Sequence, residues 1–282
     1  SISGCLLLTA CDQAVVATPT PTTITIAGAT SMRPVVQALT TEFTRQHPNV
    51  LFNLLGGSST VGEAQVQSGQ ISLAASTLVP PALSLTATLS SSATVPVRTP
   101  IGLDGLALIV HADNPLQNLT LLQLRDLFSG RILDWSELGG MSGEVLLVSR
   151  EDGSGSRVLF EQRIMGNSPV SLTAVVMPTS SDVVDFVAFN PQAIGYVSRA
   201  YVIDALAVQT GESQSAAQSV RIVGVENALP TVEQVSSQQY QLTQPLYLVS
   251  RGAPQGWVRE LIDFALSPAG QAIVARYHAP LR

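Results

Sequence analysis

The sequence predicts an α/β fold, because short apolar strands alternate with amphipathic helices along much of its length. Residues 24–26 are all β-branched and predict a strand. After them, Val36, Leu39 and Phe43 recur at the spacing of one helical face. Residues 50–54 then predict a second strand. A repeat of strand, loop, helix and strand indicates largely parallel sheets flanked by helices.

Local signals place the ends of these first elements. Pro34 falls in the first helical turn, where its missing N–H costs little, and the helix is expected to stop at His47, before Pro48. Residues 56–59 form a Gly/Ser loop after the second strand. A second helix is expected to run from this loop through Gln67.

Later segments predict a division into two lobes. The apolar runs Leu106–Val110 and Leu246–Val249 are predicted to be strands that cross from one lobe to the other. The final segment, Trp257–Tyr277, has a helical apolar pattern that breaks near Ser267. A chain of 282 residues is long enough to bury a core in each lobe.

The composition is that of a globular protein. Hydrophobic residues make up 45% of the chain and charged residues 12%, which argues against extended disorder. The formal net charge is −6, so the surface is not generally basic and nucleic acid is not expected as a partner. An anion-binding protein of this charge must concentrate its positive potential at one place.

The N-terminal residues suggest export and lipid anchoring. Residues 8–11 (Leu-Thr-Ala-Cys) resemble a bacterial lipobox, in which Cys11 is lipidated. We therefore expect residues 1–10 to be the remnant of a signal peptide and residues 11–23, rich in Pro and Thr, to be a tether. This places the protein outside the cytoplasm, anchored to the cell membrane. The alternative is an apolar end that contains a cysteine by chance.

The most informative segment is the loop Arg150–Arg157, which lies between a predicted strand and an apolar-periodic helix. A Gly/Ser turn at such a place exposes main-chain N–H groups at the positive end of the helix. Ser154 and Ser156 add hydroxyl donors, and the fork of Arg150 matches two oxygens of a tetrahedral anion. Asp152 is expected to hold Arg150 in position.

Two earlier loops repeat this pattern. Residues 28–31 and residues 57–60 each follow a strand and open a helix with consecutive hydroxyl side chains. If the three loops converge, their neutral donors and Arg150 could bind one anion. Each loop alone is more often only a helix cap, and Arg150 alone could belong to a surface ion pair.

An enzymatic function is not predicted. Ser58 or Ser154 would need a histidine as general base, and the three histidines are scattered and expected at the surface: His47, His111 and His278. The two cysteines lie at the N-terminus, and no Cys/His cluster has metal-ligand spacing. The sequence therefore predicts neither a metal site nor a cofactor.

Taken with their surroundings, these loops resemble the PstS-like phosphate-binding subunits of phosphate ABC transporters, a group of periplasmic binding proteins. Residues 150–156 (R-E-D-G-S-G-S) resemble the family loop R-x-D-G-S-G-T, with Ser in place of Thr. The resemblance extends over residues 22–282. It is also carried by these segments: Ala27–Thr30, Gly57–Ser59, Asp104–Ala107, Asp113–Pro115, Asn118–Thr120, Leu124–Gly130, Trp135–Gly140, Ile194–Val197, Pro245–Tyr247 and Ser267–Gln271.

The resemblance implies a two-lobed, type II-like binding-protein fold that closes on the anion like a hinged clamp. Residues 24–103 with 246–282 would form one lobe, and residues 104–245 the other. The partners implied are inorganic phosphate and the permease and ATPase of an ABC importer, with the binding protein itself a monomer. The residues expected to form the ligand site are Thr30, Ser31, Ser58, Ser76, Thr77, Arg150, Asp152, Ser154, Gly155 and Ser156.

One position departs from the family pattern. Some members have Ser followed by Asp where this chain has Ser76 and Thr77, and that Asp accepts the proton of hydrogen phosphate. Thr77 carries no charge to repel a fully ionised anion. A receptor for sulfate, molybdate or another oxyanion therefore remains the alternative, as does a module that senses phosphate rather than transporting it.

Overall fold

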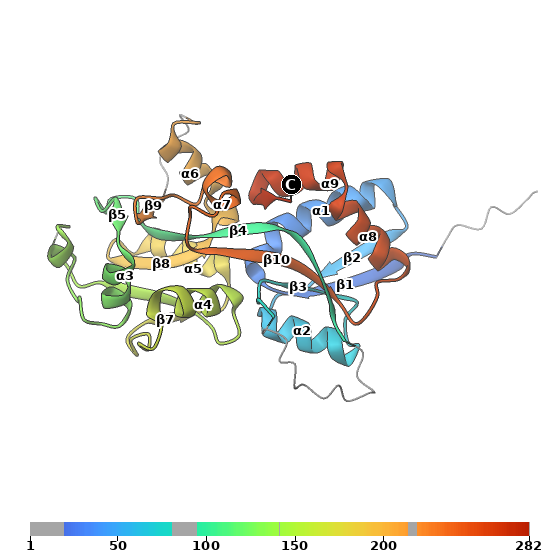
Figure 1. Ribbon diagram of the computed structural model, residues 1–282, viewed down its shortest axis with the longest axis horizontal. Coiled ribbons are helices and arrows are strands. Elements are labelled where there is room, and N and C mark those ends of the chain that lie inside the picture. Colours follow the sequence, from blue (N-terminus) through green and yellow to red (C-terminus); the bar gives the residue numbers. More distant parts are fainter. Residues whose placement is uncertain (1–19, 81–94, 141, 214–218, 282) are drawn as a thin grey trace, which may run out of the picture.

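A computed structural model describes residues 20–80, 95–140, 142–213 and 219–281 in two lobes (Figure 1). Two long strands, β4 (Val97–His111) and β10 (Thr243–Ser250), pair with each other and join the lobes. The predicted signal-peptide remnant, Cys11 and most of the predicted tether lie outside the described residues. The last two tether residues, 22 and 23, belong to the first strand.

Lobe 1 contains the N-terminal strands and the last two helices. Helix α2 lies against β1 and β3 on one side of the strands, whereas α1, α8 and α9 pack together on the other side (Figure 1). The predicted end of α1 at His47 and the break at Ser267 are confirmed. The elements of lobe 1 are β1 (Thr22–Gly28), η1 (Thr30–Met32), α1 (Arg33–Gln46), β2 (Val50–Leu54), α2 (Ser59–Ser68), β3 (Leu73–Ser76), α8 (Gly256–Leu266) and α9 (Pro268–Tyr277).

Lobe 2 is built from the middle of the chain. Its α/β elements are β5 (Asn118–Leu119), α3 (Leu121–Phe128), η2 (Trp135–Leu138), β6 (Leu146–Arg150), α4 (Gly155–Phe160), η3 (Glu161–Met165), β7 (Val175–Met177), α5 (Ser180–Phe189), β8 (Ala193–Ser198), η4 (Arg199–Tyr201), α6 (Ile203–Thr210), β9 (Val220–Val225) and α7 (Val232–Ser236). A short C-terminal strand, β11 (Ala279–Pro280), pairs with β4.

The strands form a mixed sheet in the order β2-β1-β3-β10-β4-β8-β6-β7. Within lobe 1, β1 pairs parallel with β2 and β3, and within lobe 2, β6 pairs parallel with β7 and β8. The two joining strands pair antiparallel with each other and with their neighbours β3 and β8. The predicted α/β fold with a mixed sheet is confirmed, and the antiparallel pairs gather where the chain passes between the lobes.

The two predicted crossing segments belong to the joining strands but lie on opposite sides of the crossing. Leu106–Val110 pairs with β8 and β9 in lobe 2. Tyr247–Val249 pairs with β3 in lobe 1. Both runs are apolar because each is a central strand of a lobe, so their composition reports burial and not the crossing itself. The lobe boundaries stay a prediction.

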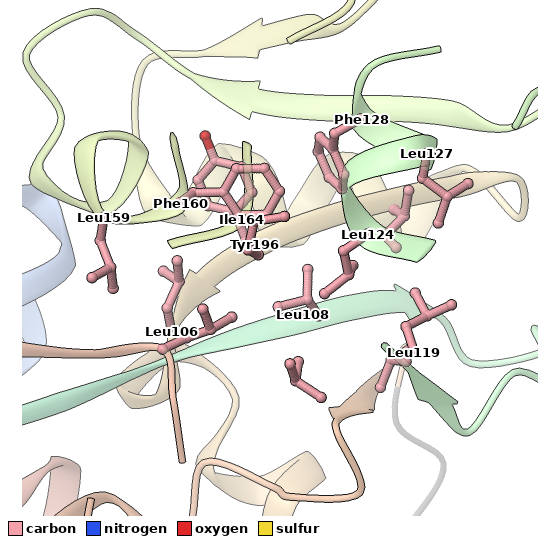
Figure 2. Close-up of a cluster of buried hydrophobic side chains, with 14 of the residues drawn as sticks. Leu106, Leu108, Leu119, Leu124, Leu127, Phe128, Leu159, Phe160, Ile164 and Tyr196 are labelled. Atoms are coloured by element: carbon pink, nitrogen blue, oxygen red, sulfur yellow. The ribbon is translucent and has the colours of Figure 1, made fainter. Parts of the chain in front are cut away.

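Each lobe has its own aromatic core. In lobe 2, Phe160 stacks on Tyr196 with ring centroids 4.2 Å apart, and Phe128 meets Phe160 edge-on (Figure 2). In lobe 1, Phe43 packs edge-on against Phe52. A fully buried side chain of this size stabilises the fold by about 1.5–3 kcal/mol. Separate cores allow the lobes to be rigid while the strands between them act as the connection.

Candidate functional site

The loops predicted to converge meet between the two lobes. The Ser58 loop touches the Gly153 loop, because the main-chain N–H and the hydroxyl of Thr60 both lie 3.3 Å from the Gly153 carbonyl. The Thr30 loop joins them through Arg150, whose Nη2 donates to Thr30 Oγ1 at 3.0 Å. Residues far apart in sequence and in different lobes therefore surround one guanidinium.

Arg150 is the last residue of β6 and is 2% exposed. Its Nη1 donates to Ser180 Oγ at 3.0 Å, and its Nε donates to the carbonyl of Met177 at 3.2 Å. Two bonds to the Glu151 carboxylate, from Nε at 2.9 Å and Nη2 at 3.0 Å, supply the counter-charge. Protein groups alone therefore hold the guanidinium in place, without a bound anion.

Asp152 does not hold Arg150, so the role predicted for it is wrong. Its carboxylate is 94% exposed and pairs with Arg157 at 2.7 Å. The reason is local: Asp152 stands at the tip of a turn in which Gly153 has φ 82°, so its side chain projects into solvent. Glu151, one residue earlier, lies beside the guanidinium instead.

The loop that follows Arg150 presents buried donors at the start of α4. Ser154 and Ser156 are 3% and 2% exposed, and Ser154 is the N-cap of the helix. Its hydroxyl oxygen accepts from the Arg157 N–H at 3.5 Å, which leaves the O–H free in direction to donate. The first N–H groups of a helix have no intrahelical acceptor, so those of Gly155 and Ser156 are available to an anion.

Ser58 occupies the equivalent place on α2. It is 5% exposed, and its hydroxyl oxygen accepts from the Val61 N–H at 3.2 Å as the N-cap. Thr30 and Ser31, 4% and 3% exposed, open the 3₁₀ turn after β1. The helix-cap interpretation of these loops is therefore correct for Ser58 and Ser154. It is compatible with an anion site, because a capping hydroxyl accepts one hydrogen bond and can still donate another.

Ser76 and Thr77 face in different directions. Ser76 Oγ donates to Glu63 Oε1 at 2.6 Å, and Glu63 is paired with Arg98, so Ser76 does not join the loops. Thr77 Oγ1 is buried, and no hydrogen-bond partner for it exists among the described residues. A Cβ placed on Gly155 would lie 2.0 Å from this oxygen. Thr77 thus packs directly against the loop that follows Arg150.

Besides Glu151, two residues that contact Thr30 were not predicted from the sequence. Ser180, fully buried at the start of α5, accepts from Arg150 and donates its N–H to Thr30 Oγ1 at 3.3 Å. Tyr201 donates its hydroxyl to the carbonyl of Thr30 at 2.5 Å. Ser180 carries a signal that could have found it, because a strand precedes it and hydroxyl residues flank it, as in the three predicted loops. Tyr201 carries no such signal.

A second polar cluster is centred on Asp104 and Gln244 of the joining strands. Asp104 is fully buried and accepts from Ser198 Oγ at 2.9 Å and from Gln244 Nε2 at 3.0 Å. Its Oδ1 also lies 3.1 Å from Nδ1 of His278, which is fully buried, so the expectation of a surface histidine is wrong there. Gln244 Nε2 reaches Ser156 Oγ at 3.4 Å and connects the cluster to the loop.

The site combines one cation with neutral donors. Burial raises the pKa of the Tyr201 hydroxyl to about 12, partly offset by the charge of Arg150, so the phenol stays protonated at neutral pH. Hydroxyls, main-chain N–H groups and Arg150 form a set that suits a tetrahedral oxyanion. Among the described residues no group of His, Cys, Asp or Glu could hold a metal ion. In the same residues, no helix has the length and hydropathy needed to span a membrane.

Comparison with known proteins finds phosphate-binding relatives of this chain. The phosphate-binding protein PstS of Bacillus subtilis is 24% identical over 245 residues, covering 86% of this chain and 75% of that protein. A phosphate ABC transporter substrate-binding protein from Clostridium perfringens, solved with bound phosphate, is 29% identical with a TM-score of 0.78, covering 93% of this chain and 100% of that one.

A second solved structure similar to this chain is also a phosphate receptor. An ABC-type phosphate transport receptor from Vibrio cholerae is 28% identical with a TM-score of 0.67, and it matches 92% of this chain and 100% of its own. The predicted resemblance to phosphate-binding proteins of ABC transporters is therefore confirmed. A family model described as a PBP superfamily domain matches residues 15–269, and the chain belongs to this superfamily.

Proposed function

We propose that the protein captures inorganic phosphate between its lobes and delivers it to an ABC permease. The observation that carries this proposal is the placement of Arg150, a buried cation bonded to Thr30 of the other lobe and bordered by the donor-rich starts of α2 and α4. The phosphate-binding relatives support the choice of ligand.

The energetics favour tight binding. A hydrogen bond to a charged group contributes about 1.5–3 kcal/mol. The ligand residues proposed are Thr30, Ser31, Ser58, Thr77, Arg150, Ser154, Gly155 and Ser156. A handful of such bonds exceeds the cost of ordering a small anion and supports a Kd below about 1 µM. The lobes then close the anion off from water, which strengthens each bond.

The cellular setting belongs to the same proposal. The protein would act outside the cytoplasm as a monomer, anchored through lipidated Cys11, with the permease and ATPase of an importer as its partners. It would have no enzymatic activity and no cofactor. Incubation with phosphate esters and acyl esters tests the absence of catalysis, because measurable hydrolysis that depends on Ser58 or Ser154 would contradict it.

Calorimetric titration with phosphate tests the central claim. We expect Arg150→Ala to abolish binding, since the anion then meets no charge, and Thr30→Ala only to weaken it. Arg131→Ala is the matched control, because Arg131 is 66% exposed and pairs with Asp126 on the surface of lobe 2. Phosphate binding that survives Arg150→Ala unchanged would place the site elsewhere.

A second candidate ligand is another oxyanion such as sulfate or molybdate. The observation that favours it is Thr77, whose hydroxyl can donate to a fully ionised anion where a carboxylate would repel it. Thr77→Asp should shift the ratio of phosphate to sulfate affinity at least about 10-fold toward phosphate. If the unmodified protein bound sulfate as tightly as phosphate or more tightly, sulfate or a similar oxyanion would replace phosphate as the proposed ligand. A role in sensing rather than uptake would be indicated if no permease and ATPase genes adjoin the gene.

A further inference from the structure

Thr30 is held by lobe 2 through two residues outside the proposed ligand set. Tyr201, the last residue of η4, donates its hydroxyl to the Thr30 carbonyl at 2.5 Å. Ser180, the first residue of α5, donates its main-chain N–H to Thr30 Oγ1 at 3.3 Å. Both bonds run from lobe 2 to lobe 1 over more than a hundred residues of sequence, and they can form only while the lobes are closed.

The two donors are rigidly mounted. Helix α5 carries Val183 and Val187, fully buried, into the second core cluster of lobe 2, so Ser180 at its start cannot follow Thr30 if lobe 1 moves away. The turn that carries Tyr201 follows β8 directly and includes the buried Arg199, whose Nε donates to the Pro230 carbonyl at 2.8 Å. Opening the lobes must therefore break both contacts.

We propose that Ser180 and Tyr201 form an interlobe latch on Thr30 that keeps the closed state populated and so lengthens the time that a bound anion stays. The identity of the retained anion rests on the proposed function, whereas the latch contacts themselves do not. Tyr201 acts on the main chain of Thr30 and is a positioning residue. It determines how long closure lasts, whereas the choice between anions is left to the groups that touch them.

The size of the effect follows from ordinary hydrogen-bond energetics. One neutral bond contributes about 0.5–1.5 kcal/mol, so its loss should change an affinity by about 2- to 10-fold. The bond exists in the closed state and not in the open one. Its loss should therefore appear in the dissociation rate, because capture of the anion by the open lobes precedes closure.

The test compares Tyr201→Phe with Tyr277→Phe in the full chain. Both tyrosines line the same surface groove, but the Tyr277 hydroxyl makes no interlobe hydrogen bond among the described residues. We expect Tyr201→Phe to release radiolabelled phosphate about 2- to 10-fold faster into excess unlabelled phosphate, with an association rate that does not fall and an unchanged ratio of phosphate to sulfate affinity. An unchanged dissociation rate, or a change in the anion ratio alone, would overturn the latch.

Ser180→Ala provides a second variant, with Ser181→Ala as its neighbour control. Because Ser180 Oγ also accepts from Arg150, this variant should weaken binding more than Tyr201→Phe does. The fold-loss of phosphate affinity in Ser180→Ala should not multiply with the fold-loss in Thr30→Ala, since both side chains position the same guanidinium. A double variant whose loss equals the product of the single losses would contradict this coupling. Melting temperatures identify any variant that fails to fold. If Ser180→Ala fails to fold, Tyr201→Phe alone still tests the latch.

Solution scattering without any anion separates the latch from the proposed function. We expect the double variant Tyr201→Phe/Ser180→Ala to have a larger radius of gyration than the unmodified protein, and Tyr277→Phe to match it. If the unmodified protein fails to bind phosphate, the proposed function falls, and this comparison still decides the latch. Equal radii in all three proteins would overturn it.

Discussion

At the scale of single residues, the site depends on how one buried positive charge is compensated. Arg150 is 2% exposed, and a charge at that depth is tolerated only with a counter-charge and satisfied hydrogen bonds. Glu151 supplies two bonds to the guanidinium, and its side chain is 25% exposed. Asp152 contributes none of this, since it pairs with Arg157 in solvent.

The two neighbouring carboxylates should therefore differ in their effect on stability. Glu151→Gln should lower the free energy of unfolding by about 1–3 kcal/mol, because it leaves the Arg150 charge without its counter-ion. Asp152→Asn is the matched control and should stay within about 0.5 kcal/mol. Urea denaturation measures both. Saturating phosphate should narrow the difference, since the anion replaces the lost charge; equal stabilities without phosphate would contradict the role of Glu151.

Close packing at Gly155 makes a second residue-scale prediction. A Cβ there would lie 2.0 Å from Thr77 Oγ1 and 3.0 Å from Ser59 Oγ, so Gly155→Ala must displace the Thr77 side chain or push the loop away from it. We expect phosphate binding at least about 10-fold weaker in calorimetry, with the fold retained. Gly56→Ala is the control, because a Cβ at Gly56 would meet nothing within 4 Å. Equal affinities of the two variants would show that the closed contact is not required.

Sequence patterns could predict only part of this arrangement. The Gly/Ser loops predicted Thr30, Ser58 and Ser154 as site residues, because consecutive hydroxyls after a strand commonly open a helix. Ser58 and Ser154 do cap their helices, whereas no side chain caps the turn that begins at Thr30. The partner of Arg150 was predicted one residue too late, since the direction of a side chain in a turn depends on a backbone angle, here at Gly153. The contact of Tyr201 with Thr30 arises from lobe closure and leaves no local trace.

At the scale of elements, the position of Ser58 is set by how closely α2 approaches β1. Gly62 on α2 faces Gly28 on β1, and a Cβ at Gly62 would lie 2.7 Å from the Gly28 Cα. Gly28 itself has φ 122°, and its own Cβ would lie 2.3 Å from the Ala75 carbonyl oxygen. The helix that carries one anion loop thus rests on the backbone of the strand that leads to another.

Gly62→Ala should move that helix. The added methyl meets main-chain atoms that cannot rotate away, so we expect the free energy of unfolding to fall by about 1–3 kcal/mol in urea denaturation. Phosphate affinity should fall as well, because Ser58 moves with the helix. Gly56→Ala is again the control, because a Cβ at Gly56 would meet nothing within 4 Å. Gly139→Ala is unsuitable, because Gly139 has φ 77°, a left-handed conformation that strains alanine. Stability and affinity equal to those of Gly56→Ala would contradict the close approach.

Element ends were predictable where a residue forces them. Pro48 ends α1, and Ser267 with Pro268 separates α8 from α9, as expected from the missing donor of proline. The crossing between lobes was not predictable to the residue. Strand β4 runs through both lobes as one element of 15 residues, so nothing in its hydropathy marks the place where one core gives way to the other.

At the scale of the whole molecule, a buried polar cluster lies where the two lobes join: Asp104, Ser198, Gln244 and His278. Asp104 and Gln244 of this cluster lie on the joining strands, whereas Ser198 ends β8 and His278 follows α9. Gln244 connects the cluster to the anion loop through Ser156. The sequence suggested a surface position for His278, because its neighbours are the end of a helix and the C-terminal tail. Only the pairing of β11 with β4 buries it against Asp104.

The buried tyrosines belong to lobe 2, and their ionisation should weaken the fold at alkaline pH. Burial raises the pKa of Tyr196 to about 12, although Ser149 and the Arg150 N–H partly oppose the shift. Burial likewise raises the pKa of Tyr201 to about 12 and that of Tyr240 still further. A tyrosine in an unfolded chain has a pKa of about 10. Between pH 10 and about 12 the unfolded state therefore binds fewer protons than the folded state, so stability falls as pH rises.

The composition of the chain makes it easier to assign this fall in stability at alkaline pH to tyrosine ionisation. All 14 basic residues are arginine, so no lysine side chain titrates in the same window. Tyr196→Phe should remove up to about 2–3 kcal/mol of the decline in unfolding free energy between pH 8 and pH 12, because Phe cannot ionise. Its loss of the bond to Ser149 at 2.9 Å lowers stability at every pH, so the slope and not the absolute value is the readout. A slope identical to that of the unmodified protein would mean that lobe 2 opens enough for Tyr196 to ionise in the folded state.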